Sequence, residues 1–238
     1  MIKKFKKFMR SFPLTRGIWC RLSDERVKKI RRDNLQKNGV ETVKTVQEIL
    51  SDTGVFFFFD MGTLLGIVRE GRLLKHDMDI DIAVVVNSEE EKTALRESLV
   101  ARGCAIRYSY SIEELGTVEE SFMMKDIKFD INYYLREDEN DVCYLMFEEP
   151  GREYPYGQLS VVKLSSPHIA ELQMKDFNGT QINVPKNAED YLAVRYGENW
   201  RIPDKGYIYW KGPSTSASRN HPRNILLQLP CSRRGFPC

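Results

Sequence analysis

The sequence predicts an α/β protein of the α+β type, in which helices and strands share one core. Segments with helical hydrophobic spacing alternate along the chain with short apolar or alternating segments, as expected when helices and strands share one core. Apolar residues make up 42% and charged residues 29% of the 238 residues, which is ordinary for a soluble globular protein. No apolar run approaches the ~18 residues that a membrane-spanning helix needs.

The expected elements follow from local patterns. In chain order they are a helix at 38–51, a strand at 55–59, a helix at 63–70, a strand at 77–86, a helix from 88 to about 102, strands at 105–110 and 127–134, and a helix at 188–196. The first helix has apolar residues at helical spacing, with Asn38 as its cap and Gly54 after its end. The strand at 55–59 is rich in phenylalanine, and aromatic residues favour strands.

The other helices have start and stop signals of their own. Gly71 ends the short second helix. Ser88, followed three residues later by Glu91, predicts a capping box at the start of the third. The last helix is expected to begin after Asn187 and to end at Gly197.

The strand predictions are clearest around the acidic segment 77–86, which alternates and then becomes fully apolar, as a strand entering the core does. The segments 105–110 and 127–134 also have strand character. Between 137 and 180 the signal weakens, because several prolines and glycines indicate loops and short strands.

Charge divides the chain into three parts. Residues 1–32 hold twelve basic and two acidic residues, and residues 211–238 hold five basic residues and no acidic one, although the whole chain carries a formal net charge of only +2. The segment 33–210 is therefore acidic and is the expected catalytic domain. Residues 1–32 are expected to form a basic arm, and 211–238 a basic, disordered tail.

The basic arm predicts a partner with negative charge. Residues 1–16 place aromatic and apolar side chains at helical spacing between lysines and arginines, a pattern that suits the surface of an anionic membrane. The alternative is a solvated basic tail. The acidic body argues against a nucleic-acid partner. No secretory signal is present, so the expected location is the cytoplasm, with possible peripheral contact at the inner face of the plasma membrane.

Three aspartates at alternate positions carry the strongest functional signal. Asp77, Asp79 and Asp81 would share one face of a strand, where their carboxylates repel one another unless a cation neutralises them. Hard oxygen ligands favour Mg²⁺ or Mn²⁺ over zinc. A calcium-binding loop is excluded, because Ile82 and Ser88 stand where that motif requires glycine and glutamate. The pattern predicts a magnesium site that shields a phosphoryl group.

Asp130 is the second acidic feature, because it lies within the apolar, alternating strand at 127–134. A charged residue inside such a strand needs a partner. If this strand pairs beside the first, Asp130 becomes a further metal ligand or the general base. A surface-facing aspartate is the alternative.

The segment before the aspartates suits phosphate binding. Gly62 and Thr63 precede a short helix whose N-terminal amides can bind phosphate, and Arg69 of that helix can bind phosphate through two nitrogens. Lys75 and His76 lie just before the acidic strand and are expected to contact substrate, although an ordinary loop histidine is the alternative for His76.

The segment GTLLGIVREGRLLKHDMDIDIAV resembles the signature of the LicD/fukutin family, and INVPKNAEDYLAVRYGENW resembles a downstream segment of the same family. With Asp130 between them, the two matches cover roughly residues 40–205. The first motif is specific and the second is moderate alone. Lys75 and His76 depart from the family pattern before the first aspartate, which leaves the donor contacts open.

The resemblance implies a nucleotidyltransferase-type fold, with a mixed β-sheet flanked by helices. It also implies transfer of a substituted phosphate, such as phosphocholine or a polyol phosphate. The implied donor is CDP-linked, and the acceptor is a hydroxyl of a surface glycan or lipid-linked glycan, of the lipopolysaccharide, capsule or teichoic-acid kind. Two alternatives remain: a nucleotidyltransferase that uses an NTP, and a non-catalytic scaffold in glycan assembly.

The resemblance also implies roles for individual residues. Asp79 and Asp81 would bind Mg²⁺ with help from Asp77, and Asp130 would complete the site or deprotonate the acceptor hydroxyl. Gly62, Thr63 and Arg69 would hold the donor phosphates. A further set would close the site or pack under it, with packing expected for the tryptophan: Tyr196, Gly197 and Trp200.

Overall fold

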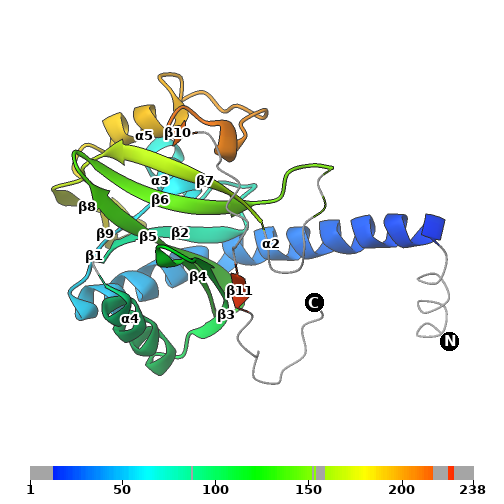
Figure 1. The fold of residues 1–238 in the computed structure, drawn as a ribbon, viewed down its shortest axis with the longest axis horizontal. Helices are drawn as coiled ribbons and strands as arrows, with labels where there is room; N and C mark the ends of the chain where they lie inside the picture. The colour runs from blue at the N-terminus through cyan, green and yellow to red at the C-terminus, as the bar shows by residue number, and fades with distance from the viewer. Residues whose placement is uncertain (1–12, 87, 152, 154–158, 217–224, 228–238) are drawn as a thin grey trace.

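The computed structural model describes the chain except residues 1–12, 87, 152, 154–158, 217–224 and 228–238. Figure 1 shows a twisted sheet with helices packed on it and one long helix that extends away from this body. The mixed sheet flanked by helices confirms the predicted fold class. No helix in the described part of the chain is long and apolar enough to cross a membrane.

The main sheet is mixed, because one parallel pair is set among antiparallel ones. Its nine strands are β1 (Phe56–Phe59), β2 (Asp79–Val85), β3 (Ala105–Ile112), β4 (Gly116–Met124), β5 (Ile127–Glu137), β6 (Asn140–Phe147), β7 (Ser160–Pro167), β10 (Thr215–Ser216) and β11 (Ile225–Leu227). β2 pairs parallel with β5 and antiparallel with β1, and β5 continues into an antiparallel pair with β6. A separate hairpin joins β8 (Leu172–Phe177) and β9 (Thr180–Pro185).

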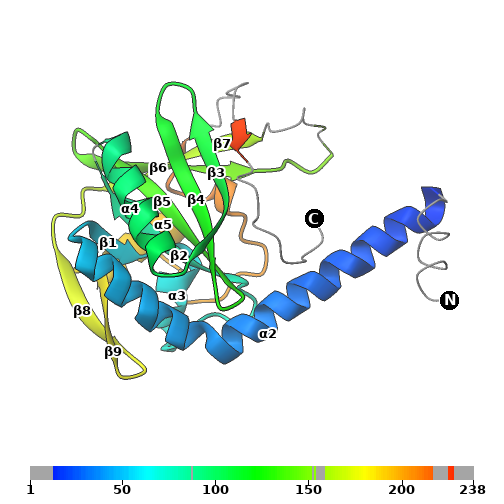
Figure 2. The ribbon, with the colours of Figure 1, turned by 90° about the horizontal axis from the view of Figure 1, so that it is seen from below.

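Four α-helices are described: α2 (Pro13–Thr53), α3 (Met61–Glu70), α4 (Glu89–Ala101) and α5 (Ala188–Tyr196). Figures 1 and 2 show α4 and the C-terminal part of α2 against one side of the sheet, with α3 and α5 on the other side. Several phenylalanine side chains are fully buried in the core. Among them, Phe122 of β4 stacks on Phe129 of β5 with ring centroids 5.3 Å apart.

Helix α2 is much longer than the predicted helix at 38–51, and Asn38 lies inside it rather than at its start. The preceding residues are mostly lysine, arginine, leucine and glutamine, which favour helix without an apolar stripe to reveal it. The helix enters the core at Leu35, while Val27 and Ile30 remain 46% and 49% exposed. The predicted membrane contact of residues 1–16 falls almost wholly outside the described residues and stays a prediction.

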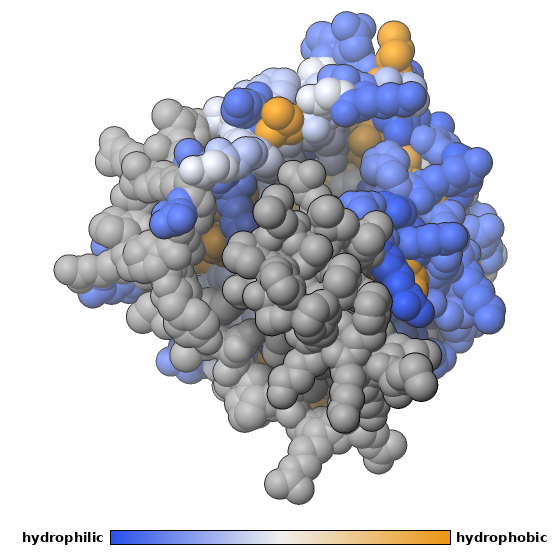
Figure 3. All heavy atoms as spheres, turned by 90° about the vertical axis from the view of Figure 1, so that its right-hand side faces the viewer, coloured by the Kyte–Doolittle hydropathy of each residue, from blue (hydrophilic) through white to orange (hydrophobic). Residues whose placement is uncertain are grey.

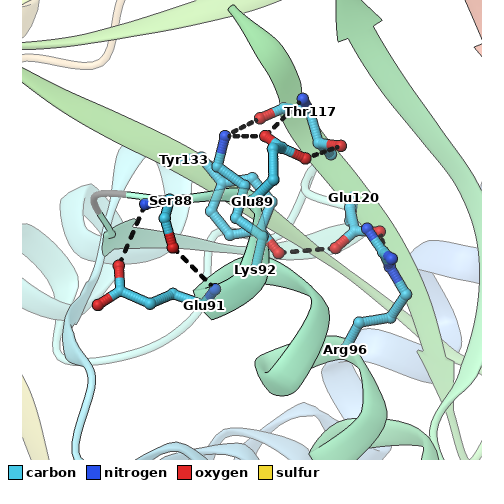
Figure 4. Close-up of polar contacts among 8 residues, drawn as sticks. All are labelled: Ser88, Glu89, Glu91, Lys92, Arg96, Thr117, Glu120 and Tyr133. Atoms are coloured by element: carbon cyan, nitrogen blue, oxygen red, sulfur yellow. Dashed lines mark hydrogen bonds and ion pairs between the residues drawn. The ribbon is translucent and has the colours of Figure 1, made fainter.

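Helix α4 begins as predicted, and polar contacts fix it on the sheet (Figure 4). Ser88 and Glu91 form both hydrogen bonds of the capping box. The buried Lys92 donates to Glu89 and to the carbonyl of Thr117, both at 2.6 Å. One turn later the helix reaches strand β4 again, where Arg96 pairs with a fully buried carboxylate, Glu120.

Strand β4 was not predicted, because its residues do not alternate between polar and apolar as those of an ordinary strand do. Glu119 and Glu120 are adjacent and therefore point to opposite faces, yet both are buried. Glu120 accepts hydrogen bonds from Tyr133 at 2.6 Å and Ser109 at 2.9 Å, besides its pair with Arg96. Partners supplied by distant segments make these burials possible, and local sequence cannot show them.

The boundaries of several other elements differ from the predicted ones. The strand expected at 77–86 starts only at Asp79, after a turn. Gly71 ends α3 in the left-handed conformation, as predicted, whereas Asn187 precedes α5 without a side-chain cap. The weak region 137–180 contains two full strands of eight residues, β6 and β7. The expected boundary at 210 lies inside a 3-10 helix, Tyr209–Lys211, and β10 and β11 then add two short strands to the sheet.

Candidate active site

A pocket of about 1250 Å³ opens on one face of the sheet. Its floor is formed by residues of β2, β3, β4 and β5, and its walls by α3, by the end of α5 and by the segment 199–209. This is the opposite face to the one that carries the stacked phenylalanines. The pocket thus combines a polar floor with partly aromatic walls.

Five aspartates line this pocket, among them the four predicted to bind metal, and strand geometry explains three of those four. Asp79 and Asp81 are two residues apart in β2, so both point to the same face. Strand β5 runs parallel with Asp130 directly opposite Asp81, and Asp130 therefore joins them. Asp77 lies in the turn before β2 and also lines the pocket. The structure brings together all four residues predicted to bind metal.

The carboxylates are close enough to affect one another. Burial raises the pKa of Asp81 well above its usual range, and the charges of Asp79 and Asp130 raise it further. Burial, followed by the charge of Asp79, raises the pKa of Asp77 to about 7. The pKa of Asp130 is also raised, mainly by burial. The pocket therefore holds more negative charge than the protein alone neutralises well.

Lys128 is a site residue that the sequence analysis missed. Its ammonium lies 2.9 Å from Asp79 Oδ2 and 2.7 Å from Asp130 Oδ2. Burial acts to lower the pKa of Lys128, but the charges of Asp130 and Asp79 outweigh it and raise the pKa well above its usual range. One feature of the sequence could have revealed it. Lys128 lies two residues before Asp130, and residues i and i+2 of a strand share a face.

A divalent cation fits this donor set, although the site is not a ready-made cage. Among the described residues, no group of three or more histidine, cysteine, aspartate or glutamate side chains is arranged to hold a metal ion. However, Asp130 Oδ1 is buried without a hydrogen-bond partner. Mg²⁺ commonly takes one or two protein carboxylates and completes its shell with water and phosphate oxygens. Asp79, Asp81 and Asp130 are the residues that would hold it.

The residues at the start of α3 position the aspartates. Thr63 is fully buried, and its hydroxyl accepts a hydrogen bond of 2.9 Å from the backbone N–H of Asp81. This side chain does not line the pocket, so the predicted phosphate contact of the Thr63 hydroxyl is not supported. Gly62 does line the pocket, and a Cβ at this position would lie 2.7 Å from Asp77 Oδ2. Glycine is needed here for the close approach of Asp77.

Gly62→Ala is therefore expected to displace the Asp77 carboxylate and to weaken Mn²⁺ binding about tenfold, with a loss in stability of no more than about 1 kcal/mol. Calorimetric titration with Mn²⁺ and urea denaturation measure the two effects. In the Asp77→Ala background, the alanine should cost little further affinity, because the clashing carboxylate is gone. Unchanged Mn²⁺ affinity in the single variant would contradict this role for Gly62.

Arg69 lines the pocket but already has partners in the described structure. One terminal nitrogen donates to the carbonyl of Trp200 at 3.2 Å, and the other to Glu70 at 3.0 Å. Trp200 is 5% exposed and belongs to the hydrophobic core, in agreement with the packing role expected for it. Arg69 therefore ties α3 to the segment after α5, beside the pocket.

Of the three other residues predicted to contact substrate, two line the pocket and one does not. His76 lines the pocket with a largely exposed ring, and its Nε2 lies 3.7 Å from Asp77 Oδ1. Tyr196 lines the pocket and packs against Tyr207, with ring centroids 4.9 Å apart. Lys75 is exposed and does not line the pocket, so the structure gives no support to its predicted substrate contact.

A buried network behind the aspartates was also missed by sequence analysis. Asp60, directly before α3, is fully buried and accepts hydrogen bonds from Tyr134 at 2.5 Å and Tyr191 at 2.8 Å. Arg195 of α5 pairs with the same carboxylate at 3.1 Å. The backbone N–H of Asp60 also donates to the carbonyl of Asp81 at 3.0 Å. The network thus fixes the start of α3 and the acidic strand against α5.

Aromatic residues and one further carboxylate complete the pocket. Tyr110 of β3 lies opposite Glu119 of β4, and both line the pocket together with Tyr108 and Tyr209. Burial, followed by the charge of Asp130, raises the pKa of Glu119 to about 8. Such a wall offers flat surfaces for a ring and polar groups for hydrogen bonds. None of these four residues was predicted from the sequence.

Residues 54–187 match the LicD/FKTN/FKRP nucleotidyltransferase domain, which is more than half of the chain. The chain belongs to this family. The match includes α3 and the strands that carry Asp79, Asp81 and Asp130. The LicD/fukutin resemblance seen in the sequence is thereby confirmed.

The curated relatives of this LicD-family chain include ribitol-5-phosphate transferase FKTN of Mus musculus, 24% identical over 216 residues, and of Homo sapiens, 22% identical over 215 residues. These alignments cover 87% of this chain and 44% of each relative, so the chain spans less than half of their length. An uncharacterized protein of Rickettsia prowazekii, RP689, is 25% identical over 152 residues, which covers 61% of this chain and 57% of that protein.

Among solved structures, ANT(2″)-Ia in complex with adenylyl-2″-tobramycin is similar at a TM-score of 0.37 and 17% identity. The similarity covers 61% of this chain and 70% of that chain.

Proposed function

We propose that this LicD-family chain transfers a substituted phosphate, such as ribitol phosphate or phosphocholine, from a CDP-linked donor to a hydroxyl of a surface glycan, with Mg²⁺ or Mn²⁺ as cofactor. The observation that carries the proposal is the register that places Asp130 beside Asp81 and Asp79 in one pocket. The relatives named ribitol-5-phosphate transferases support the transfer of a phosphate that carries an alcohol.

The residues divide the work as follows. Asp79, Asp81 and Asp130 would hold the cation, which when bound would shield the negative charge of the donor diphosphate. A carboxylate of the pocket that the cation leaves free accepts the proton of the acceptor hydroxyl. The acceptor oxygen forms a new bond to the phosphorus that carries the alcohol. The bond from this phosphorus to the bridging oxygen breaks, and CMP leaves with that oxygen.

The walls of the pocket position the two substrates. Arg69 is at the edge of the pocket, where it can exchange a contact with Glu70 for one with a phosphate oxygen. Tyr196 and Tyr209 present aromatic surface for the base or for a sugar ring. A glycan acceptor is compatible with work at the cytoplasmic face of a membrane, which stays a prediction.

The test is release of CMP from a panel of CDP-alcohols, including CDP-ribitol and CDP-choline, with Mg²⁺ and a glycan acceptor. We expect release with at least one donor, and its loss when EDTA removes the metal. Consumption of an NTP with release of pyrophosphate, and none with any CDP-alcohol, would instead identify a nucleotidyltransferase. Full transfer in EDTA would contradict the metal requirement.

A further inference from the structure

Lys128 occupies a place that carboxylate chemistry would otherwise give to a second cation. Its ammonium touches one oxygen of Asp79 and one oxygen of Asp130, at 2.9 Å and 2.7 Å. These two residues come from different strands, β2 and β5, and both are among the candidate metal ligands. The Lys128 ammonium thus lies between two carboxylates of the cluster and bridges them, rather than contacting a single carboxylate at its edge.

The surroundings hold this ammonium in place. The Lys128 side chain is 14% exposed, and its ammonium lies 5.7 Å from the ring centroid of Tyr108, in cation–π contact. A buried lysine costs desolvation energy, so it persists only where the local negative charge offsets that cost. Asp79 and Asp130 supply this charge by direct contact, and further aspartates line the same pocket.

Two polar side-chain atoms of strand β5 have no hydrogen-bond partner among the described residues. Asp130 Oδ1 and the side-chain nitrogen of Asn132 are both buried without hydrogen-bond partners, and both residues line the pocket. The Asp130 side chain is 9% exposed. One oxygen of Asp130 is therefore bound to Lys128, while the other has no hydrogen-bond partner, and Asp81 is the neighbour of Asp130 across the two strands.

We propose that the Lys128 ammonium replaces the second divalent cation of a two-cation site, so that this pocket binds a single Mg²⁺ or Mn²⁺. Two-metal phosphoryl-transfer sites place their ions about 3.5–4 Å apart and clamp the substrate oxygens from two sides. Here one ion, held by Asp81 and the free oxygen of Asp130, would take one side. The lysine, a compact point charge that binds phosphate, would take the other.

This inference rests on the proposed function only in taking the aspartate pocket as a divalent-cation site. The test is the number of Mn²⁺ ions bound per chain, measured by electron paramagnetic resonance and by calorimetry in the presence of CDP. We expect about one ion for the wild type and for Lys128→Arg, which keeps the charge. Lys128→Met frees oxygens on Asp79 and Asp130 and is expected to bind about two.

One ion of unchanged affinity in Lys128→Met would overturn the inference, and so would two ions in the wild type. Lys128→Gln, which keeps the length and polarity of the side chain without its charge, gives the same reading if the methionine variant does not fold. A second ion in these variants, together with no turnover of any CDP-alcohol by the wild type, would uphold the inference and reject the proposed function. Turnover with a single ion in every variant would do the reverse.

Discussion

Asp81→Asn is expected to remove transfer activity and, at the same time, to make the metal-free protein more stable. Asp81 is half-buried on the floor of the pocket, and both its desolvation and the neighbouring carboxylates disfavour its charge. Asparagine keeps the shape and removes this repulsion, which should raise the melting temperature by about 2–4 °C per 1 kcal/mol gained. Loss of a ligand to the cation should lower the rate at least 100-fold, or about 2.7 kcal/mol of transition-state stabilisation.

The activity is measured as CMP release with Mg²⁺, and the melting temperature in EDTA. Asp176→Asn is the matched control, since Asp176 is exposed on strand β8, away from the pocket, and should change neither quantity by much. The account is contradicted if Asp81→Asn retains full activity. A large fall in melting temperature would show instead that the carboxylate is needed for folding.

Arg195→Met is expected to produce the largest loss of stability, about 3–5 kcal/mol. The side chains of Arg195 and Asp60 are 4% and 0% exposed, and the substitution leaves a buried carboxylate without its cation. Tyr134 and Tyr191 would still donate to Asp60, but neither carries a positive charge. Because Asp60 starts α3, the damage should reach the pocket as well.

Urea denaturation measures this loss. The double variant Asp60→Asn/Arg195→Met removes both charges and should recover a large part of the stability, because the cost arises from the unpaired charge. Lys186→Met breaks an exposed pair with Glu171 and should cost less than about 1 kcal/mol. A similarly small cost for Arg195→Met would show that the buried pair does not hold the fold together.

Local patterns predicted the acidic end of the site because its signal is contained in short segments. Strand alternation placed Asp79 and Asp81 on one face, and the unusual charge within an apolar strand singled out Asp130. Their proximity depends on the parallel pairing of β2 with β5, which the sequence could only suggest. The start of the helix at Ser88 was predictable for the same reason, since its capping box lies within four residues.

The residues that were missed depend on contacts between distant segments. Asp60 and Arg195 are 135 positions apart, and neither shows from its neighbours that it is buried. Lys128 and Glu119 were not singled out, because the partners that allow a charged residue to be buried come from other strands. The closeness of Gly62 to Asp77, in turn, is a property of backbone packing that no residue pattern records.

The most direct test of the account is a crystal structure with Mn²⁺ and CDP, in which anomalous scattering locates the metal. We expect a peak about 2.0–2.6 Å from carboxylate oxygens of the pair Asp81 and Asp130 or of Asp79, with the diphosphate of CDP completing the shell. Manganese bound elsewhere, with the pocket aspartates still paired only to Lys128 while CDP is present, would contradict it.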